Sequence, residues 1–516
     1  MSDLEKVLHK FVESFEHRLN EALQEQKVTG ANEKVANASS TGKVEPANYD
    51  DEFFSKAADD YIQFTYENPT IYHVVNHFSE VLEAKGFTYV SEKEKWNIEP
   101  GKYYTTRNGT ALIAFVVGKN WDPSKGVGAI GSHIDSLTAA LKPNSSKSPV
   151  DGYDLLGVAP YAGTLGNVWF DRDLGIGGRL LVRDGSTKEV TQKLVDSTPQ
   201  PIAKIPSLAP HFGEPSKGPF NTETQAVPVI GYGGAERAAE PTESEKSAPL
   251  YGKHPLQLLR YIAKKAKVDV ADILQWDLQL YDVQRGTKGG LDSEFVFAPR
   301  IDDRICSYAA IQALIGAAEA GQIPEDNFSV VGLFDNEEIG SGTRQGIRGG
   351  LFETVVSRVV SGIQDDETSV NDLLSVTYAN SIILSADVNH LVNPNFDNIY
   401  LEHHKPVPNK GVVIALDPNG HMATDSIGLA LVEELAKKNG DEIQYFQIRN
   451  DSRSGGTIGP FISMQTGART IDLGIPQLSM HSIRATVGAK DIGNGIKFFQ
   501  GFFSNWRKSY DKYIDL

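Results

Sequence analysis

Cysteine is almost absent from this sequence: Cys306 is the only one among 516 residues. A single cysteine cannot form an intramolecular disulfide, and it excludes a cysteine-rich zinc site. Any metal ion must therefore be bound by His, Asp and Glu side chains, which favours hard or borderline divalent ions.

Long apolar runs are also missing. No stretch approaches the length of about 18 apolar residues that a membrane-spanning helix needs. The N-terminus lacks the apolar block and the small-residue cleavage site of a secretory signal. We therefore expect synthesis and folding in the cytoplasm, without insertion into a membrane.

Basic residues are too few to balance the acidic ones. The sequence has 50 Lys and Arg against 67 Asp and Glu, a net charge of −17, which opposes nucleic acid or anionic membrane as a partner. The motifs H-E-x-x-H, G-x-S-x-G and G-x-x-x-x-G-K-[ST] do not occur. Their absence excludes a zincin helix, a serine nucleophile elbow and a P-loop.

The length and the residue patterns predict more than one domain. Short apolar runs alternate with helical segments, which is typical of an α/β fold with a mainly parallel central sheet flanked by helices. Residues 141–295 differ, being richer in Pro and Gly with short β-like pieces, and we expect them to form an inserted β-rich domain. The main domain would then comprise residues 46–140 and 296–516.

The N-terminal segment, residues 1–45, has a pattern of its own. Apolar residues recur at spacings of three and four from Leu4 to Leu23, which predicts an amphipathic helix. The residues that follow it are almost free of large apolar side chains and are typical of a flexible linker. We expect a separable unit, the alternative being a helix packed on the main domain.

Several apolar runs deliver a histidine or an acid at or just after their ends. Because the carboxyl ends of parallel strands line one crevice, we expect these side chains to converge. One such residue alone is more often an ordinary polar strand end, but several together suit two metal ions that share one bridging acid, with a spare acid as catalyst. The residues are His133, Asp135, Asp302, Asp303, Glu337, Glu338, Asp387 and His481.

The motifs around these residues resemble a known family. "GSHIDS", "WFDRDL", "APRIDDR", "DNEEIGS", "SADVNH", "RSGGTIGP" and "QLSMHSIRA" are similar to the dinuclear zinc aminopeptidases that include aspartyl aminopeptidase. The resemblance runs from about residue 50 to the C-terminus. "NPTIYHVV", "IPSLAPHFG" and "DPNGHMATD" resemble the fungal vacuolar branch of that family in particular.

The resemblance implies two Zn²⁺ ions per subunit, and it assigns the residues that would bind each ion. It gives His133 and Asp387 to one zinc ion and Glu338 and His481 to the other, with Asp302 bridging them.

The resemblance also implies the roles of three residues that are not ligands. Glu337 would act as general base and then as general acid, while Asp135 would orient His133, as metal-bound imidazoles generally require. His211, in the inserted domain, would reach into the site of a neighbouring subunit and help to stabilise the oxyanion.

Assembly and location follow from the same resemblance. It implies a homo-oligomer, in the family a tetrahedral dodecamer, with the inserted domain as the dimerisation domain. Residues 1–45 correspond to a propeptide, so the chain would be a zymogen that a receptor carries from the cytoplasm to the vacuole. The substrates would be peptides with a neutral, leucine-type N-terminal residue.

Two alternatives remain open. The chain could be a self-assembling structural or cargo protein whose metal site is a relic, although a relic need not keep the base Glu337. It could also be a different dinuclear hydrolase, such as a deacylase that acts on small amides.

Overall fold

The computed structural model describes residues 49–233, 239–363 and 369–513. The predicted N-terminal helix and linker lie outside these residues. In the described part, no helix is both long enough and apolar enough to cross a lipid bilayer.

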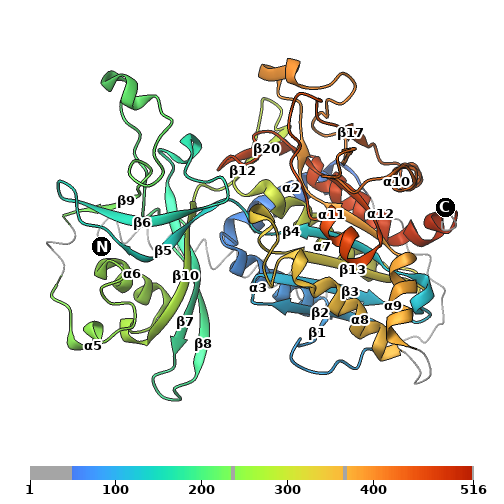
Figure 1. Cartoon of the computed structure of the whole chain (residues 1–516), viewed down its shortest axis with the longest axis horizontal. Helices are drawn as coiled ribbons and strands as arrows, with labels where there is room; N and C mark the ends of the chain where they lie inside the picture. Colours follow the sequence, from blue (N-terminus) through green and yellow to red (C-terminus); the bar gives the residue numbers. More distant parts are fainter. Residues whose placement is uncertain (1–48, 234–238, 364–368, 514–516) are drawn as a thin grey trace, which may run out of the picture. The chain divides into compact units, whose positions relative to one another are not determined.

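A nine-stranded sheet forms the centre of the main domain (Figure 1). Its four middle strands, in the order β13, β4, β14 and β18, are all parallel to one another, whereas antiparallel pairs occur on both sides of them. The predicted mainly parallel sheet is thus confirmed for its centre. The order across the sheet is β1 (Thr88–Tyr89), β2 (Gly101–Arg107), β3 (Ala111–Val117), β13 (Phe328–Phe334), β4 (Gly128–His133), β14 (Ile382–Ala386), β18 (Arg469–Gly474), β16 (Val413–Ala415) and β17 (Gln444–Phe446).

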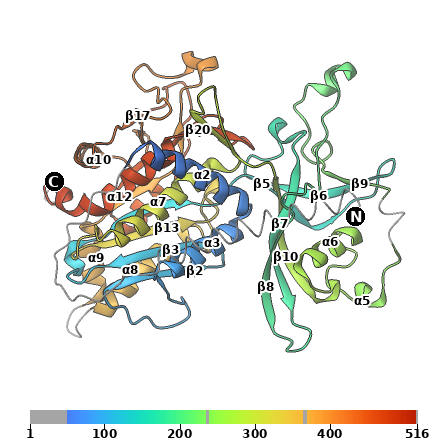
Figure 2. The same ribbon diagram turned by 180° about the vertical axis from the view of Figure 1, so that it is seen from behind.

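Helices cover both faces of this sheet (Figures 1 and 2), which explains why every residue of β4, β13 and β14 is buried. One apolar core lies under the helices of one face: α2 (Asp51–Glu67), α3 (Ile71–Ala84), α7 (Ile301–Glu319), α10 (Ser426–Asn439) and α12 (Asp491–Tyr510). A second core lies under those of the other face: α8 (Leu351–Ile363), α9 (Val370–Ala379) and α11 (Gly459–Thr466).

Local sequence explains where α10 begins and ends. The side chain of Asp425 accepts a hydrogen bond from the backbone N–H of Gly428, which satisfies a free donor of the first turn. Gly440 ends the helix in the left-handed conformation that glycine adopts without a steric penalty.

A second sheet, of six strands, lies within residues 138–282. All its strand pairs are antiparallel, and α6 (Leu256–Ala266) packs on it around a separate apolar core. The sheet falls almost wholly inside the segment predicted as an insertion. Its order is β8 (Val190–Asp196), β7 (Leu174–Arg183), β10 (Ile273–Asp282), β5 (Thr138–Ser146), β6 (Tyr153–Tyr161) and β9 (Val229–Tyr232).

One apolar run does not join the central sheet as expected. The run before Asp302 forms β12 (Phe295–Ala298), which pairs with β11 (Thr287–Gly289) and β20 (Ala485–Gly488) in a small sheet of its own. Asp302 and Asp303 therefore come from the start of α7 and not from the end of a central strand. That part of the prediction was wrong, although the side chain of Asp302 still reaches the same crevice.

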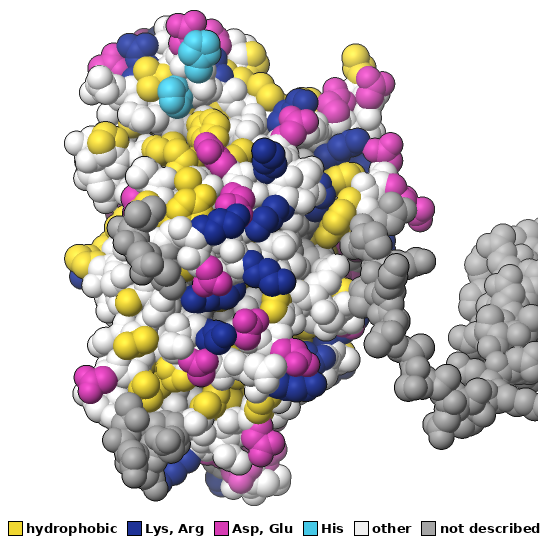
Figure 3. All heavy atoms as spheres, turned by 90° about the vertical axis from the view of Figure 1, so that its right-hand side faces the viewer, with side chains coloured by type: hydrophobic (Ala, Val, Ile, Leu, Met, Phe, Trp, Pro, Cys, Tyr) yellow, Lys and Arg dark blue, Asp and Glu magenta, His cyan; other side chains and the backbone are white. Residues whose placement is uncertain are grey.

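Acidic and basic side chains are mixed over the face drawn in Figure 3. Lys and Arg lie beside Asp and Glu there, and apolar side chains are scattered between them. Such a face is typical of a solvated protein surface.

Candidate metal centre

Three neighbouring strands of the central sheet deliver residues of the site at one edge. His133 is the last residue of β4, and Asp387 follows the last residue of β14. Glu337 and Glu338 lie in a single 3-10 turn, η6 (Glu337–Ile339), shortly after β13. Because β13, β4 and β14 are parallel neighbours, their ends meet, as expected from the sequence.

Two further residues reach the same place from other elements. Asp302 lies in the first turn of α7, and the amide of Gln477 donates a hydrogen bond of 3.3 Å to its Oδ2. His481 lies in the connection between β19 (Pro476–Gln477) and β20. Its side chain is 58% exposed, whereas that of Glu338 is only 5% exposed, so the site opens to solvent on the His481 side.

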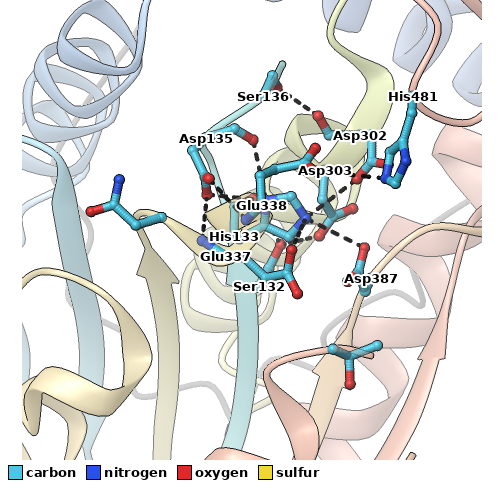
Figure 4. A network of polar contacts seen from close by, with 12 residues as sticks. Ser132, His133, Asp135, Ser136, Asp302, Asp303, Glu337, Glu338, Asp387 and His481 are labelled. Carbon is cyan, nitrogen blue, oxygen red and sulfur yellow. Dashed lines mark hydrogen bonds and ion pairs between the residues drawn. The ribbon is translucent and has the colours of Figure 1, made fainter. Parts of the chain in front are cut away.

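The side chains form two groups, each with ligand atoms within 4.8 Å of one another (Figure 4). The first group contains His133, Glu337 and Asp387, and the second contains Asp302, Glu338 and His481.

Asp302 lies between the two groups. Its Oδ1 is 3.3 Å from Nε2 of His133, and its Oδ2 is 3.6 Å from Nε2 of His481. Nε2 of His133 is also 3.5 Å from Oδ1 of Asp387, and Nε2 of His481 is 3.6 Å from Oε2 of Glu338. One carboxylate thus faces both imidazoles, one oxygen to each.

The site concentrates negative charge where water is largely excluded. Burial, together with the neighbouring carboxylates, raises the pKa of Glu337 to about 8 and that of Glu338 to about 10. Burial also raises the pKa of Asp387. Carboxylates that crowd together in this way need a proton or a cation to compensate them.

The donor set fits divalent metal ions. Oε1 of Glu338 is buried and has no hydrogen-bond partner. Imidazole nitrogens and carboxylate oxygens are ligands that zinc accepts. Nδ1 of His133 is taken by Asp135, at 3.2 Å from Oδ1 and 3.1 Å from the carbonyl oxygen, so Nε2 is the nitrogen that faces the other ligands.

Asp135 is buried and connects several parts of the site. Besides its contact with His133, its Oδ1 accepts a hydrogen bond of 3.1 Å from the backbone N–H of Glu337. Its Oδ2 accepts one of 3.2 Å from the backbone N–H of Glu338 and one of 2.7 Å from the hydroxyl of Tyr161.

His211 is not brought into the site by its own chain. It lies on the short 3-10 helix η3 (Pro210–Phe212), which has no buried residue. Among the described residues, neither ligand group includes it.

Sequence reasoning overlooked His390 and Tyr161. His390 ends β15 (Asn389–His390). Burial lowers the pKa of its imidazole, the charge of Asp302 raises it, and that of His481 lowers it further. The motif "SADVNH", which ends at His390, was the available signal. Tyr161 had none.

Two adjoining groups of imidazoles and carboxylates, at the carboxyl edge of a parallel sheet, define a metallohydrolase site. Residues 64–503 match the family described as aminopeptidase I zinc metalloprotease (M18). The chain belongs to this family of zinc metalloaminopeptidases, which confirms the resemblance seen in the motifs.

Individual relatives agree with the family. The chain is 57% identical over 476 residues to vacuolar aminopeptidase 1 of Saccharomyces cerevisiae, covering 91% of each protein. It is 39% identical to an aspartyl aminopeptidase of Aspergillus oryzae, covering 87% of this chain and 95% of that one. A solved structure of the S. cerevisiae mApe1 dodecamer superposes with a TM-score of 0.81 at 52% identity, covering 90% of this chain and 100% of that one.

Proposed function

We propose that this metalloaminopeptidase removes neutral, leucine-type residues from the N-termini of peptides in the vacuole, using two zinc ions per subunit. The observation that carries the proposal is the position of Asp302, whose two oxygens face the imidazoles of two separate ligand groups. His133 and Asp387 would hold one ion, Glu338 and His481 the other, and Asp302 would contact both. Bound zinc lowers the pKa of water and polarises a carbonyl group.

Glu337 is the general base of the proposed reaction. Its carboxylate lies in the first ligand group, with Oε2 at 3.9 Å from Nε2 of His133, and it is not needed as a ligand if Asp302 is shared. Glu337 takes the proton from the attacking water and then gives it to the departing amine. Burial raises the pKa of the Glu337 carboxyl, and cations held by the neighbouring ligands would lower it, which favours the ionised form that accepts a proton.

Asp135 supports this chemistry without touching the substrate. It fixes Nδ1 of His133, which directs Nε2 towards the ligands, and it holds the backbone at Glu337 and Glu338. His211 would act in the site of a neighbouring subunit, where an imidazole donor can stabilise the developing oxyanion. Its exposed position on η3 leaves it available for such a contact.

Assembly and location are proposed from relatives. The dodecamer of the S. cerevisiae protein supports a dodecamer here. We propose that it is tetrahedral, with the inserted six-stranded sheet as the dimerisation domain. The name of the 57% identical relative supports the vacuole as the place of action, reached from the cytoplasm by a receptor that recognises residues 1–45. The apolar face of the helix predicted in residues 1–45 would let assembled particles cluster. Deletion of those residues should leave peptidase activity and the core oligomer unchanged. It should abolish the concentration-dependent clustering, measured by light scattering, and delivery to the vacuole.

The decisive assay compares three substrates of the purified protein: leucine p-nitroanilide, aspartate p-nitroanilide and N-acetyl-leucine p-nitroanilide. The proposal expects hydrolysis of the first, with metal analysis giving two zinc ions per subunit. Preference for the aspartate substrate would show that this protein is specific for acidic N-terminal residues, as the names of the aspartyl aminopeptidase relatives indicate for those proteins. Removal of the acetyl group from the third substrate, detected as released acetate, without cleavage of any anilide bond would indicate a deacylase. No cleavage of either kind by zinc-loaded protein would indicate a structural protein with a relic site.

A further inference from the structure

Tyr161 brings the inserted sheet into contact with the metal centre. It is the last residue of β6 and pairs with Thr138 of β5. Its backbone N–H donates to Oγ1 of Thr164 at 2.9 Å, and that hydroxyl in turn donates to the carbonyl of Thr138 at 2.9 Å. The backbone of Tyr161 is therefore held in place by the six-stranded sheet.

The hydroxyl of Tyr161 makes two hydrogen bonds at the other end of the side chain. It donates to Oδ2 of Asp135 at 2.7 Å and accepts from Nδ2 of Asn336 at 2.9 Å. Oδ1 of Asn336 accepts from Thr343 at 2.8 Å and from Gln345 at 3.1 Å, so the amide of Asn336 turns its donor towards the tyrosine. An ionised carboxylate only accepts, so the Tyr161 hydroxyl must donate to Asp135. Its oxygen is then free to accept from the amide of Asn336.

Besides Tyr161, the described partners of the Asp135 carboxylate are groups that Asp135 itself has to align. They are Nδ1 of His133 and the backbone N–H groups of Glu337 and Glu338. Tyr161 is the partner on Oδ2 that belongs to neither ligand group. It also contacts Asn336, the residue just before Glu337, so one hydroxyl supports both the carboxylate and the turn that carries the two glutamates.

We infer that Tyr161 is a positioning residue: its hydroxyl fixes Asp135 and the Asn336–Glu338 turn, and so makes zinc retention depend on the inserted sheet. The inference rests on the proposed role of Asp135. Tyr161 does not touch the ligand atoms, and it acts only through the residues that it holds.

The test compares Tyr161→Phe with a matched control, Tyr104→Phe. Tyr104, a buried tyrosine of β2, likewise donates to a carboxylate, Oε1 of Glu83 in α3, at 2.6 Å, and it lies in neither ligand group. Each zinc-loaded protein is mixed with a chelator, and zinc release is followed directly. Loss of a partner that orients a ligand typically costs about 10- to 100-fold in metal affinity or activity.

Because Tyr161 acts on His133 only through Asp135, we expect Tyr161→Phe to release zinc on the order of 10-fold faster than wild type, and Tyr104→Phe to release it at the wild-type rate. In assays with limiting zinc, kcat of Tyr161→Phe should fall with little change in KM, and added zinc should restore much of it. Near-ultraviolet circular dichroism of both variants verifies that they are folded, and a general folding defect would not respond to added zinc.

The inference is overturned if folded Tyr161→Phe keeps zinc as wild type does while Asp135→Asn releases it rapidly. In that case Asp135 acts as proposed but does not need the tyrosine. If Asp135→Asn also keeps zinc as wild type does, the role of Asp135 in the proposed function fails first, and the inference fails with it.

Discussion

Glu337 and Glu338 are adjacent in the sequence, but their carboxylates lie in different ligand groups. Glu337 lies with His133 and Asp387, whereas Glu338 lies with Asp302 and His481. The 3-10 turn η6, held by Asp135 through both backbone N–H groups, presents the two side chains in these separate directions. Two adjacent glutamates can thus have two different roles, which substitution of each residue separately can distinguish.

Glu337→Gln should keep its zinc and its assembly, because Glu337 is not proposed as a ligand. Loss of the general base should lower kcat by about 10²- to 10⁴-fold. Glu338→Gln, the matched comparison, should lose one zinc ion. Metal analysis and steady-state kinetics of both proteins check this, and the opposite pattern of zinc loss would reverse the roles of the two neighbours.

His211→Ala should lower kcat by about 10²- to 10³-fold with little loss of metal, the usual effect of removing one oxyanion donor. The exposed His403, whose side chain is 86% accessible, offers a control in His403→Ala, which should be nearly neutral.

If His211 acts in a neighbouring subunit, mixed oligomers of His211→Ala and Glu337→Gln should regain part of the activity. Some sites in them would combine an intact Glu337 with an intact His211 from the neighbour. Mixed oligomers that stay as inactive as the parent variants would refute the action between subunits.

Gly474, at the end of β18, packs against the backbone of a proposed ligand. A Cβ atom there would lie 1.6 Å from the carbonyl oxygen of Asp387, so Gly474→Ala must displace that residue. We expect loss of zinc and of most activity. Gly185→Ala is the control, because a Cβ at Gly185 meets nothing within 4 Å. Equal zinc content in the two variants would contradict the prediction.

Asp491 predicts a pH dependence of stability away from the metal centre. Its carboxyl is 1% exposed and accepts from the backbone N–H groups of Asn409 and Gly488, at 2.9 Å and 3.1 Å, but burial raises its pKa to about 7. The folded state therefore binds more protons than the unfolded state between about pH 4 and pH 7, and the contribution of Asp491 to stability falls as pH rises through this range.

Asp491→Asn removes this titration. The free energy of unfolding of wild type relative to Asp491→Asn should decrease by roughly 1 kcal/mol for each pH unit from pH 5 to pH 7, with the slope falling off towards pH 7. Urea denaturation at fixed zinc concentration measures the difference. Asp292→Asn, at an exposed position, serves as the control substitution, and a pH-independent difference for Asp491→Asn would contradict the assignment.

Local patterns were sufficient to predict much of the site. β4, β13 and β14 are buried along their whole length, so a His or an acid at or shortly after the end of each run stands out, and parallel pairing brings such residues together. The element that carries Asp302, the start of α7, could not be predicted in this way. Its preceding run pairs with β20, nearly 200 residues later, and a short apolar run does not reveal its partner strand.

Tyr161 illustrates what sequence patterns leave out. It is one of 19 tyrosines and belongs to none of the motifs that carried the family resemblance. Its closeness to Asp135 depends on the antiparallel register of β5 and β6, which pairs Tyr161 with Thr138, three residues after Asp135. The register shifts between Leu141 and Ser146, and such an irregularity is a property of the folded sheet and not of a local pattern.

The two ligand groups draw on residues from position 133 to position 481, carried by β4, α7, η6, β14 and the connection before β20. Ions bound there would act as cross-links between distant parts of the chain, and closing such long loops removes conformational entropy that the unfolded chain would otherwise keep. Metal removal should therefore weaken the whole main domain and not only the crevice. A chain cut anywhere between those positions cannot hold a complete site on either fragment.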